Sequence, residues 1–103
     1  MILVNTDFIT DQEIETISIV KGSAILAKHI GKDILSGIKT IVGGELTEYN
    51  DMMNEARSIA TRRMVEEAEA YGADGVVNIR YASAEVVSGA AEVIAYGTAV
   101  RFR

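Results

Sequence analysis

The sequence lacks cysteine, proline and tryptophan, and its only histidine is His29. Without cysteine the chain forms no disulfide, thiolate metal site, iron–sulfur cluster or cysteine nucleophile. A single histidine excludes a zinc site built from several histidines of one chain. There is also no low-complexity tract and no long run of like charge that would mark a linker. We therefore expect residues 1–103 to form one domain.

Membrane and nucleic-acid signals are missing as well. No apolar run approaches the roughly 18–20 residues that a membrane-spanning helix needs. The N-terminus lacks the basic region of a secretory signal. The chain carries 10 basic and 15 acidic residues, for a net charge of −5, which argues against nucleic acid and anionic membranes as partners. We expect a soluble, cytoplasmic protein that binds neither.

What the chain does contain is small and branched apolar residues. Hydrophobic residues make up 49% of it, with 13 Ile, 10 Val and 13 Ala against 4 Leu and 2 Phe. Ile and Val favour strands, whereas Ala favours helices and close backbone approach. A chain of this size buries roughly two-thirds of its surface on folding. The apolar content is generous for a monomer, so we expect further copies of the chain to cover part of it.

Alternating apolar positions predict the strands. A long strand is expected over 13–28, bent or bulged near Gly22, and a short one over 2–4. Two further strands over 76–87 and 91–103 form a hairpin, because Ser88 and Gly89 lie between them.

Helical periodicity fills the middle of the chain. Apolar residues at one-, three- and four-residue spacings predict a first helix that carries Ile30, Ile34, Leu35, Ile38 and Ile41 on one face. The pair Gly43-Gly44 ends that helix. A second helix is expected from Glu45 to Tyr71, with an apolar stripe that includes Tyr49 and Tyr71 at its ends.

This order of strand, helix, helix, strand and strand predicts an α+β fold. We expect a small antiparallel-rich sheet with two helices on one face. The last strand carries Ala95, Gly97 and Ala99 on one side, which leaves room for a packed helix or for a neighbouring subunit. Two helices cannot cover both faces of the sheet, so the far face needs a partner.

Five short motifs follow one another along nearly the whole chain. They are V-K-G-S-A at Val20–Ala24, V-G-G-E at Val42–Glu45, E-A-R at Glu55–Arg57, Y-G-A-D-G-V-V at Tyr71–Val77 and Y-G-T-A-V at Tyr96–Val100. In this order and spacing they resemble the YbjQ-like family of small bacterial and archaeal proteins.

The resemblance implies more than the residues show. The family carries the label of a heavy-metal-binding domain, and its biological role is not established. Its fold is similar to the dodecin subunit, and its members assemble as ring-shaped pentamers. The resemblance therefore implies a homopentamer in which strands of adjacent subunits build a central barrel.

Few residues of this chain are candidate metal ligands. Soft metals prefer thiolates, which are absent. Oxygen ligands suit Mg²⁺ or Ca²⁺, and a ring could repeat one histidine or one carboxylate around its axis. The candidates are His29, Glu45, Glu48 and Asp51, with Glu55 on the same side of the expected helix. The alternative is that His29 is a polar junction residue and that the acids form a solvated helix face.

Other chemistry is thinly supported. The serines have no second histidine and no obvious lysine base nearby in sequence, so no catalytic residues are assigned. Gly43-Gly44 precedes a helix N-terminus, where phosphates bind, but Glu45 and Glu48 in the first turn would repel a phosphate, so helix capping is the better explanation of the pair. Dodecins bind flavins, so a flat ligand is an alternative to simple packing for Tyr49, Tyr71, Tyr81 and Tyr96.

These observations favour a non-enzymatic, ring-forming protein of unknown role, with no cofactor assigned. Two alternatives stay open. One is a metal- or small-ligand-binding module whose site forms between subunits. The other is a structural or interaction scaffold without a ligand.

Overall fold

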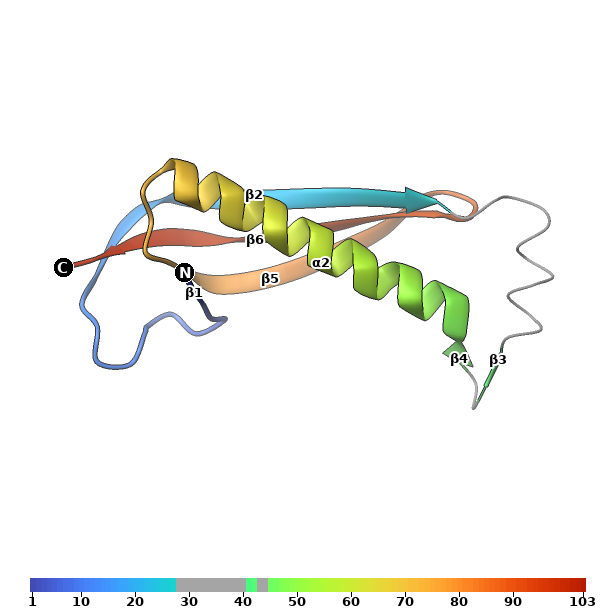
Figure 1. Cartoon of the computed structure of the whole chain (residues 1–103), viewed down its shortest axis with the longest axis horizontal. Helices are drawn as coiled ribbons and strands as arrows, with labels where there is room; N and C mark the ends of the chain where they lie inside the picture. Colours follow the sequence, from blue (N-terminus) through green and yellow to red (C-terminus); the bar gives the residue numbers. More distant parts are fainter. Residues whose placement is uncertain (28–40, 43–44) are drawn as a thin grey trace.

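The computed structural model describes residues 1–27, 41–42 and 45–103. A four-stranded sheet in the order β1-β5-β6-β2 carries helix α2 on one face, and β3 pairs with β4 in a separate two-stranded sheet (Figure 1). The elements are β1 (Ile2–Leu3), β2 (Ile14–Ala27), β3 (Ile41–Val42), β4 (Glu45–Leu46), α2 (Thr47–Ala70), β5 (Gly75–Val87) and β6 (Ala90–Phe102).

Strand β6 is the centre of the larger sheet. It pairs antiparallel with β2 on one side and with β5 on the other, along nearly its full length. The hairpin between β5 and β6 is confirmed, and Gly89 supplies a φ of 82° in its turn. The short strand β1 pairs parallel to the start of β5, so the sheet is mixed rather than wholly antiparallel.

The core lies between α2 and the sheet and is built from small residues. The helix turns a stripe of four fully buried residues toward the strands: Ala56, Ala60, Met64 and Ala68. The buried residues of the sheet that pack against this stripe are Val20, Ala24, Val93, Ala95 and Ala99. The side of the last strand that carries Ala95 and Ala99 therefore faces a helix of the same chain.

Gly22 serves a different purpose from the one that the sequence indicates. The irregularity of β2 lies between Thr16 and Ser18, not at Gly22. Gly22 instead lies directly beneath the helix, where a Cβ atom would meet the backbone of Ala60 and Met64. The absence of a side chain lets the backbones of helix and strand approach closely.

The predicted helices are only partly observed. The first is expected from Ile30 to the Gly43-Gly44 pair. Residues 30–40 and 43–44 lie outside the described residues, and the expectation is wrong at Ile41, which belongs to β3. The second begins at Thr47 rather than Glu45, because Glu45 pairs with β3 as part of β4. It ends at Ala70, so Tyr71 lies beyond the helix and is exposed rather than part of the core stripe.

Candidate functional site

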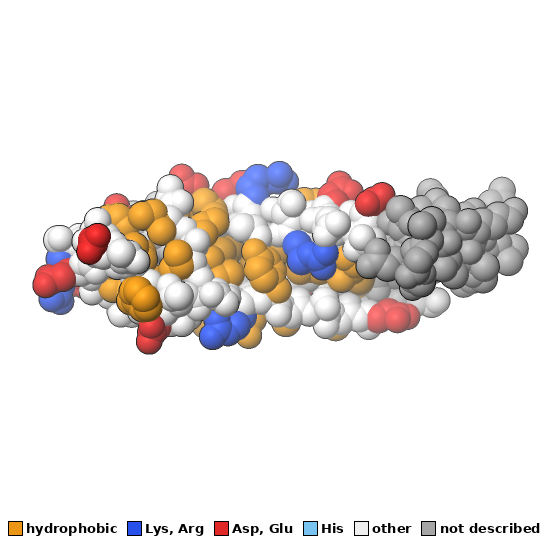
Figure 2. Space-filling model, turned by 90° about the horizontal axis from the view of Figure 1, so that it is seen from below, with side chains coloured by type: hydrophobic (Ala, Val, Ile, Leu, Met, Phe, Trp, Pro, Cys, Tyr) orange, Lys and Arg blue, Asp and Glu red, His pale blue; other side chains and the backbone are white. Residues whose placement is uncertain are grey.

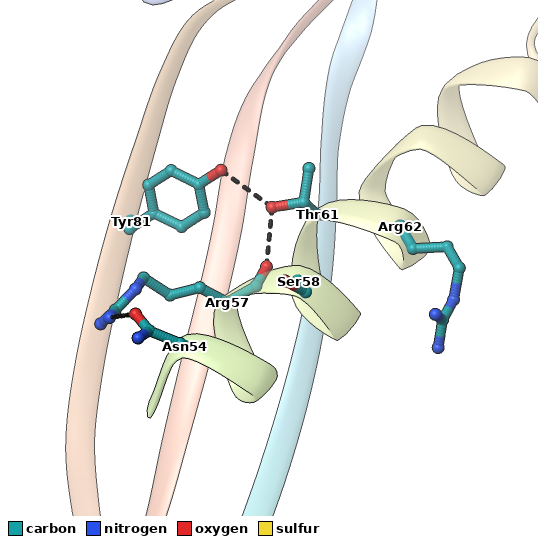
Figure 3. A pocket seen from close by; sticks show the side chains of 6 residues that line it. All are labelled: Asn54, Arg57, Ser58, Thr61, Arg62 and Tyr81. Atoms are coloured by element: carbon teal, nitrogen blue, oxygen red, sulfur yellow. Dashed lines mark hydrogen bonds between the residues drawn. The ribbon is translucent and has the colours of Figure 1, made fainter. Parts of the chain in front are cut away.

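A broad groove opens between α2 and β5. It has a volume of about 720 Å³. Its lining is polar apart from one aromatic ring, and consists of Asn54, Arg57, Ser58, Thr61, Arg62 and Tyr81 (Figure 3).

The helix and the strand each bring their residues to the groove through their own periodicity. Positions 54, 57, 58 and 61 recur at spacings of one, three and four, so they form a polar stripe next to the buried one. On β5, Tyr81 pairs with the buried Ala95 of β6 and so lies on the helix side of the sheet. Because α2 crosses the sheet obliquely (Figure 1), the β5 residues beyond Ile79 are left exposed.

A hydrogen-bond chain fixes the tyrosine. The Thr61 hydroxyl donates to the backbone carbonyl of Arg57 at 2.7 Å, and the Thr61 Oγ1 and Tyr81 hydroxyl oxygens are 2.8 Å apart. The Thr61 hydroxyl has a single hydrogen to donate, and its hydrogen bond to the Arg57 carbonyl uses it. The Tyr81 hydroxyl therefore donates to Thr61, and its lone pairs remain available as acceptors.

The cationic part of the groove is also ordered. Nη2 of Arg57 donates to Oδ1 of Asn54 (Figure 3), which fixes the amide so that its NH₂ group is the free donor. Arg57 and Asn54 extend toward the side where Tyr81 lies, whereas Arg62 extends away from them. The lining contains no carboxylate, although the whole chain has a net charge of −5.

The predicted metal ligands do not form a site in the part of the chain that is described. His29 lies outside the described residues. Glu45 belongs to β4, whereas Glu48 and Asp51 belong to α2, so the three do not follow one another on a single helix. Asp51 is exposed on α2. Among the residues that the structure describes, no three His, Cys, Asp or Glu side chains gather in a way that could hold a metal ion.

The four tyrosines are not brought together. Tyr49 borders a smaller pocket of about 280 Å³ beside the hairpin turn, Tyr81 lines the larger groove, and Tyr71 follows the helix. Tyr96 lies on β6 between buried residues, so it points to the face of the sheet opposite α2. The sequence indicates Tyr81 as a candidate but not its partners on α2, which only the polar spacing of 54, 57, 58 and 61 could have indicated.

The face of the sheet opposite α2 exposes apolar side chains. Ile19 and Ile25 of β2 are 71% and 60% exposed, and Tyr96 of β6 is 37% exposed.

Figure 2 shows a different side of the molecule, along β5, where hydrophobic side chains gather from the N-terminal loop toward the middle, with basic groups among them. In the described part of the chain, no helix is long and apolar enough to cross a membrane.

The comparisons with known proteins agree with this class of small α+β protein. The family model described as "Putative heavy-metal-binding" matches residues 1–103, and the chain belongs to this YbjQ-like family. A UPF0145 protein of Alkaliphilus metalliredigens is 69% identical over 102 residues, which cover 99% of each chain. A UPF0145 protein of the archaeon Methanosarcina acetivorans is 56% identical over 98% of this chain and 96% of its own.

A solved structure has the same fold. It is a protein of unknown function of the DUF74 family from Pediococcus pentosaceus, with a TM-score of 0.72, 16% sequence identity, and coverage of 100% of this chain and 98% of the other. The expected family and the α+β class are thus confirmed, with relatives in bacteria and archaea. The function of the family is not established.

Proposed function

We propose that this chain works as a subunit of a closed homo-oligomeric ring, most simply a pentamer, and that it is not an enzyme. The observation that carries the proposal is that two edges of the larger sheet, β2 and the later part of β5, have no strand neighbour among the residues that the structure describes. A strand edge exposes a row of N–H and C=O groups that readily pair with another chain.

The first open edge belongs to β5. The N-terminal segment covers its beginning, where the Ile79 amide donates to the Val4 carbonyl at 3.2 Å. From Arg80 to Val87, no described residue forms a strand along the outer side of β5. The second open edge is the outer side of β2, which has no strand neighbour within the described ranges either.

The two open edges lie on opposite sides of one sheet and have different sequences. Pairing β5 of one copy with β2 of the next is therefore a heterologous contact, which generates a ring when the rotation closes. The exposed Ile19 and Ile25 would then line the inside of a barrel of strands, away from water. Burial of that surface supplies the driving force that an isolated sheet lacks.

The role that we favour for the ring is a cytoplasmic structural or interaction scaffold, without nucleic acid or membrane as partners. The alternative is a module that holds a metal or small ligand between subunits, which the description of the family favours. Oxygen ligands or a repeated His29 would hold such a metal. A dodecin-like arrangement with a second helix before α2 belongs to the same proposal, and the periodicity of Ile30, Ile34 and Ile38 supports it.

Native mass spectrometry of protein purified without chelator tests the assembly and reports any retained ion. We expect a species with the mass of five 11.1 kDa chains. Ile25→Glu places a charge on the surface proposed to be covered, so it should dissociate the ring. Tyr71→Glu puts the same charge on another exposed apolar residue, beyond the end of α2, and should leave the ring intact. A stable monomer of the unmodified chain at micromolar concentration would refute the proposal.

A further inference from the structure

The groove between α2 and β5 combines a positive charge, fixed hydrogen-bonding groups and an exposed aromatic ring. We propose that it binds a small molecule in which a phosphate group is attached to a flat ring. Arg57 and Asn54 would hold the phosphate, and Tyr81 would stack against the ring.

The N–H groups of Arg57 and Asn54 are the reason for placing a phosphate at one end of the groove. The Arg57 guanidinium uses one nitrogen to fix the Asn54 carbonyl oxygen, and its other N–H groups remain for a ligand. The planar fork of an arginine matches the oxygens of a phosphate, which it binds through charge-assisted hydrogen bonds. The Asn54 NH₂ group adds a neutral donor beside it. No carboxylate of the lining opposes a negatively charged ligand.

The exposed side chain of Tyr81 is the reason for placing the flat ring of the ligand at the other end of the groove. Its side chain is held in place because its hydroxyl donates to Thr61, which is itself bound to the helix backbone. Tyr81 nevertheless keeps 49% of its surface exposed. A fixed, accessible aromatic face stacks on flat rings with little loss of conformational entropy. The groove is open rather than enclosed, so a ring stacked on Tyr81 and a phosphate at Arg57 would lie side by side along it.

This site does not depend on the proposed ring of subunits. Every group that it uses comes from one chain, and the side chains lie on the helix side of β5. The assembly proposal concerns the backbone edge of β5 and the opposite face of the sheet. Failure of the ring therefore leaves the site intact, whereas formation of the ring would bring α2 of the next copy, which packs on its own β2, to the same side of the sheet beside the groove. Oligomeric state and ligand binding are measured separately, so failure of one proposal is distinguishable from failure of the other.

Titration of the full-length protein with phenyl phosphate and with inorganic phosphate tests the site, read by backbone amide chemical shifts. We expect saturable binding of phenyl phosphate, with the largest shifts at residues 54–61 and at Tyr81. Inorganic phosphate should bind about fivefold or more weakly, because it lacks the ring that stacks on Tyr81. Tyr81→Ala should abolish this preference for phenyl phosphate.

A charge-matched pair of variants separates the site from general attraction. Arg57→Gln should weaken the binding of phenyl phosphate about tenfold or more. Arg63→Gln removes the same charge from the same helix, but Arg63 does not line the groove and donates instead to the Ser23 carbonyl of β2 at 2.7 Å, so affinity should change less than about twofold. Thermal unfolding of each variant checks that it is folded. The proposal is wrong if the unmodified protein shows no saturable binding at millimolar phenyl phosphate, or if both variants weaken binding equally.

Discussion

Helix α2 lies very close to the backbone of β2 at Gly22, and adding one methyl group there should strongly destabilise the protein. A Cβ at Gly22 would lie within 2.7 Å of the Arg63 carbonyl carbon and even nearer to the backbone of Ala60 and Met64. These obstacles are backbone atoms in the middle of a helix, so no change of rotamer relieves the overlap. The helix must move away from β2, and the small residues packed around this contact must separate.

Overpacking of a tight core typically costs about 1–3 kcal/mol, and the rigid backbone places Gly22→Ala at or above the upper end of that range. For a domain near 100 residues, 1 kcal/mol shifts the melting temperature by about 4–8 °C. We therefore expect Gly22→Ala to lower the melting temperature by more than about 10 °C, measured by circular dichroism. Ser23→Ala, at the next and exposed position of β2, should shift it by less than about 2 °C. Equal melting of Gly22→Ala and the unmodified protein would show that α2 does not pack on β2 as described.

Three further predictions test other parts of the molecule. Gly97→Val should lower the melting temperature, because a Cβ at Gly97 would lie 2.8 Å from Cγ1 of Val76 on the neighbouring strand. Asp74→Ala should cost about 1 kcal/mol in denaturant unfolding, since it removes the carboxylate that accepts the Phe102 amide at 2.8 Å. Calorimetry with zinc should show no nanomolar affinity, because the chain has no cysteine and only one histidine. Nanomolar zinc binding that survives His29→Ala would contradict this expectation.

The elements that the sequence predicts well are those with a long, regular pattern. Helix α2 is found within two residues of its expected bounds, and strands β5 and β6 within one residue, because each repeats its apolar period several times. The turn at Gly89 is equally well predicted, since a positive φ favours glycine. These features depend only on residues near one another in the sequence.

Features that depend on distant residues were missed. The short strand over 2–4 was expected and is observed as β1, but its parallel pairing with Gly75 and Val76 of β5, 73 positions further along the chain, was not. Gly22 gives the same local signal for a bend as for a close approach, and only the position of α2 distinguishes the two. Ile41 fits the helical period of the preceding segment, yet it pairs with Leu46 as a strand.

The candidate site was harder to predict than the fold. Tyr81 and Thr61 are 20 positions apart and meet only because the strand after α2 returns beneath the helix. Polar residues at helical spacing are typical of any solvated helix face. What distinguishes Asn54 and Arg57 is the exposed tyrosine opposite them, which comes from a different element.

The distribution of apolar volume over the two faces of the sheet links folding to assembly. Beneath α2 the buried positions are occupied mainly by alanine and valine, and Met64 is the largest fully buried side chain. The larger Ile19 and Ile25 lie on the uncovered face. A single chain thus buries its small residues and leaves two of its large ones in water, although burial of a large apolar side chain stabilises by about 1.5–3 kcal/mol. Assembly would recover that energy, so stability should rise with protein concentration, as mass action requires of a folded state that binds its own copies.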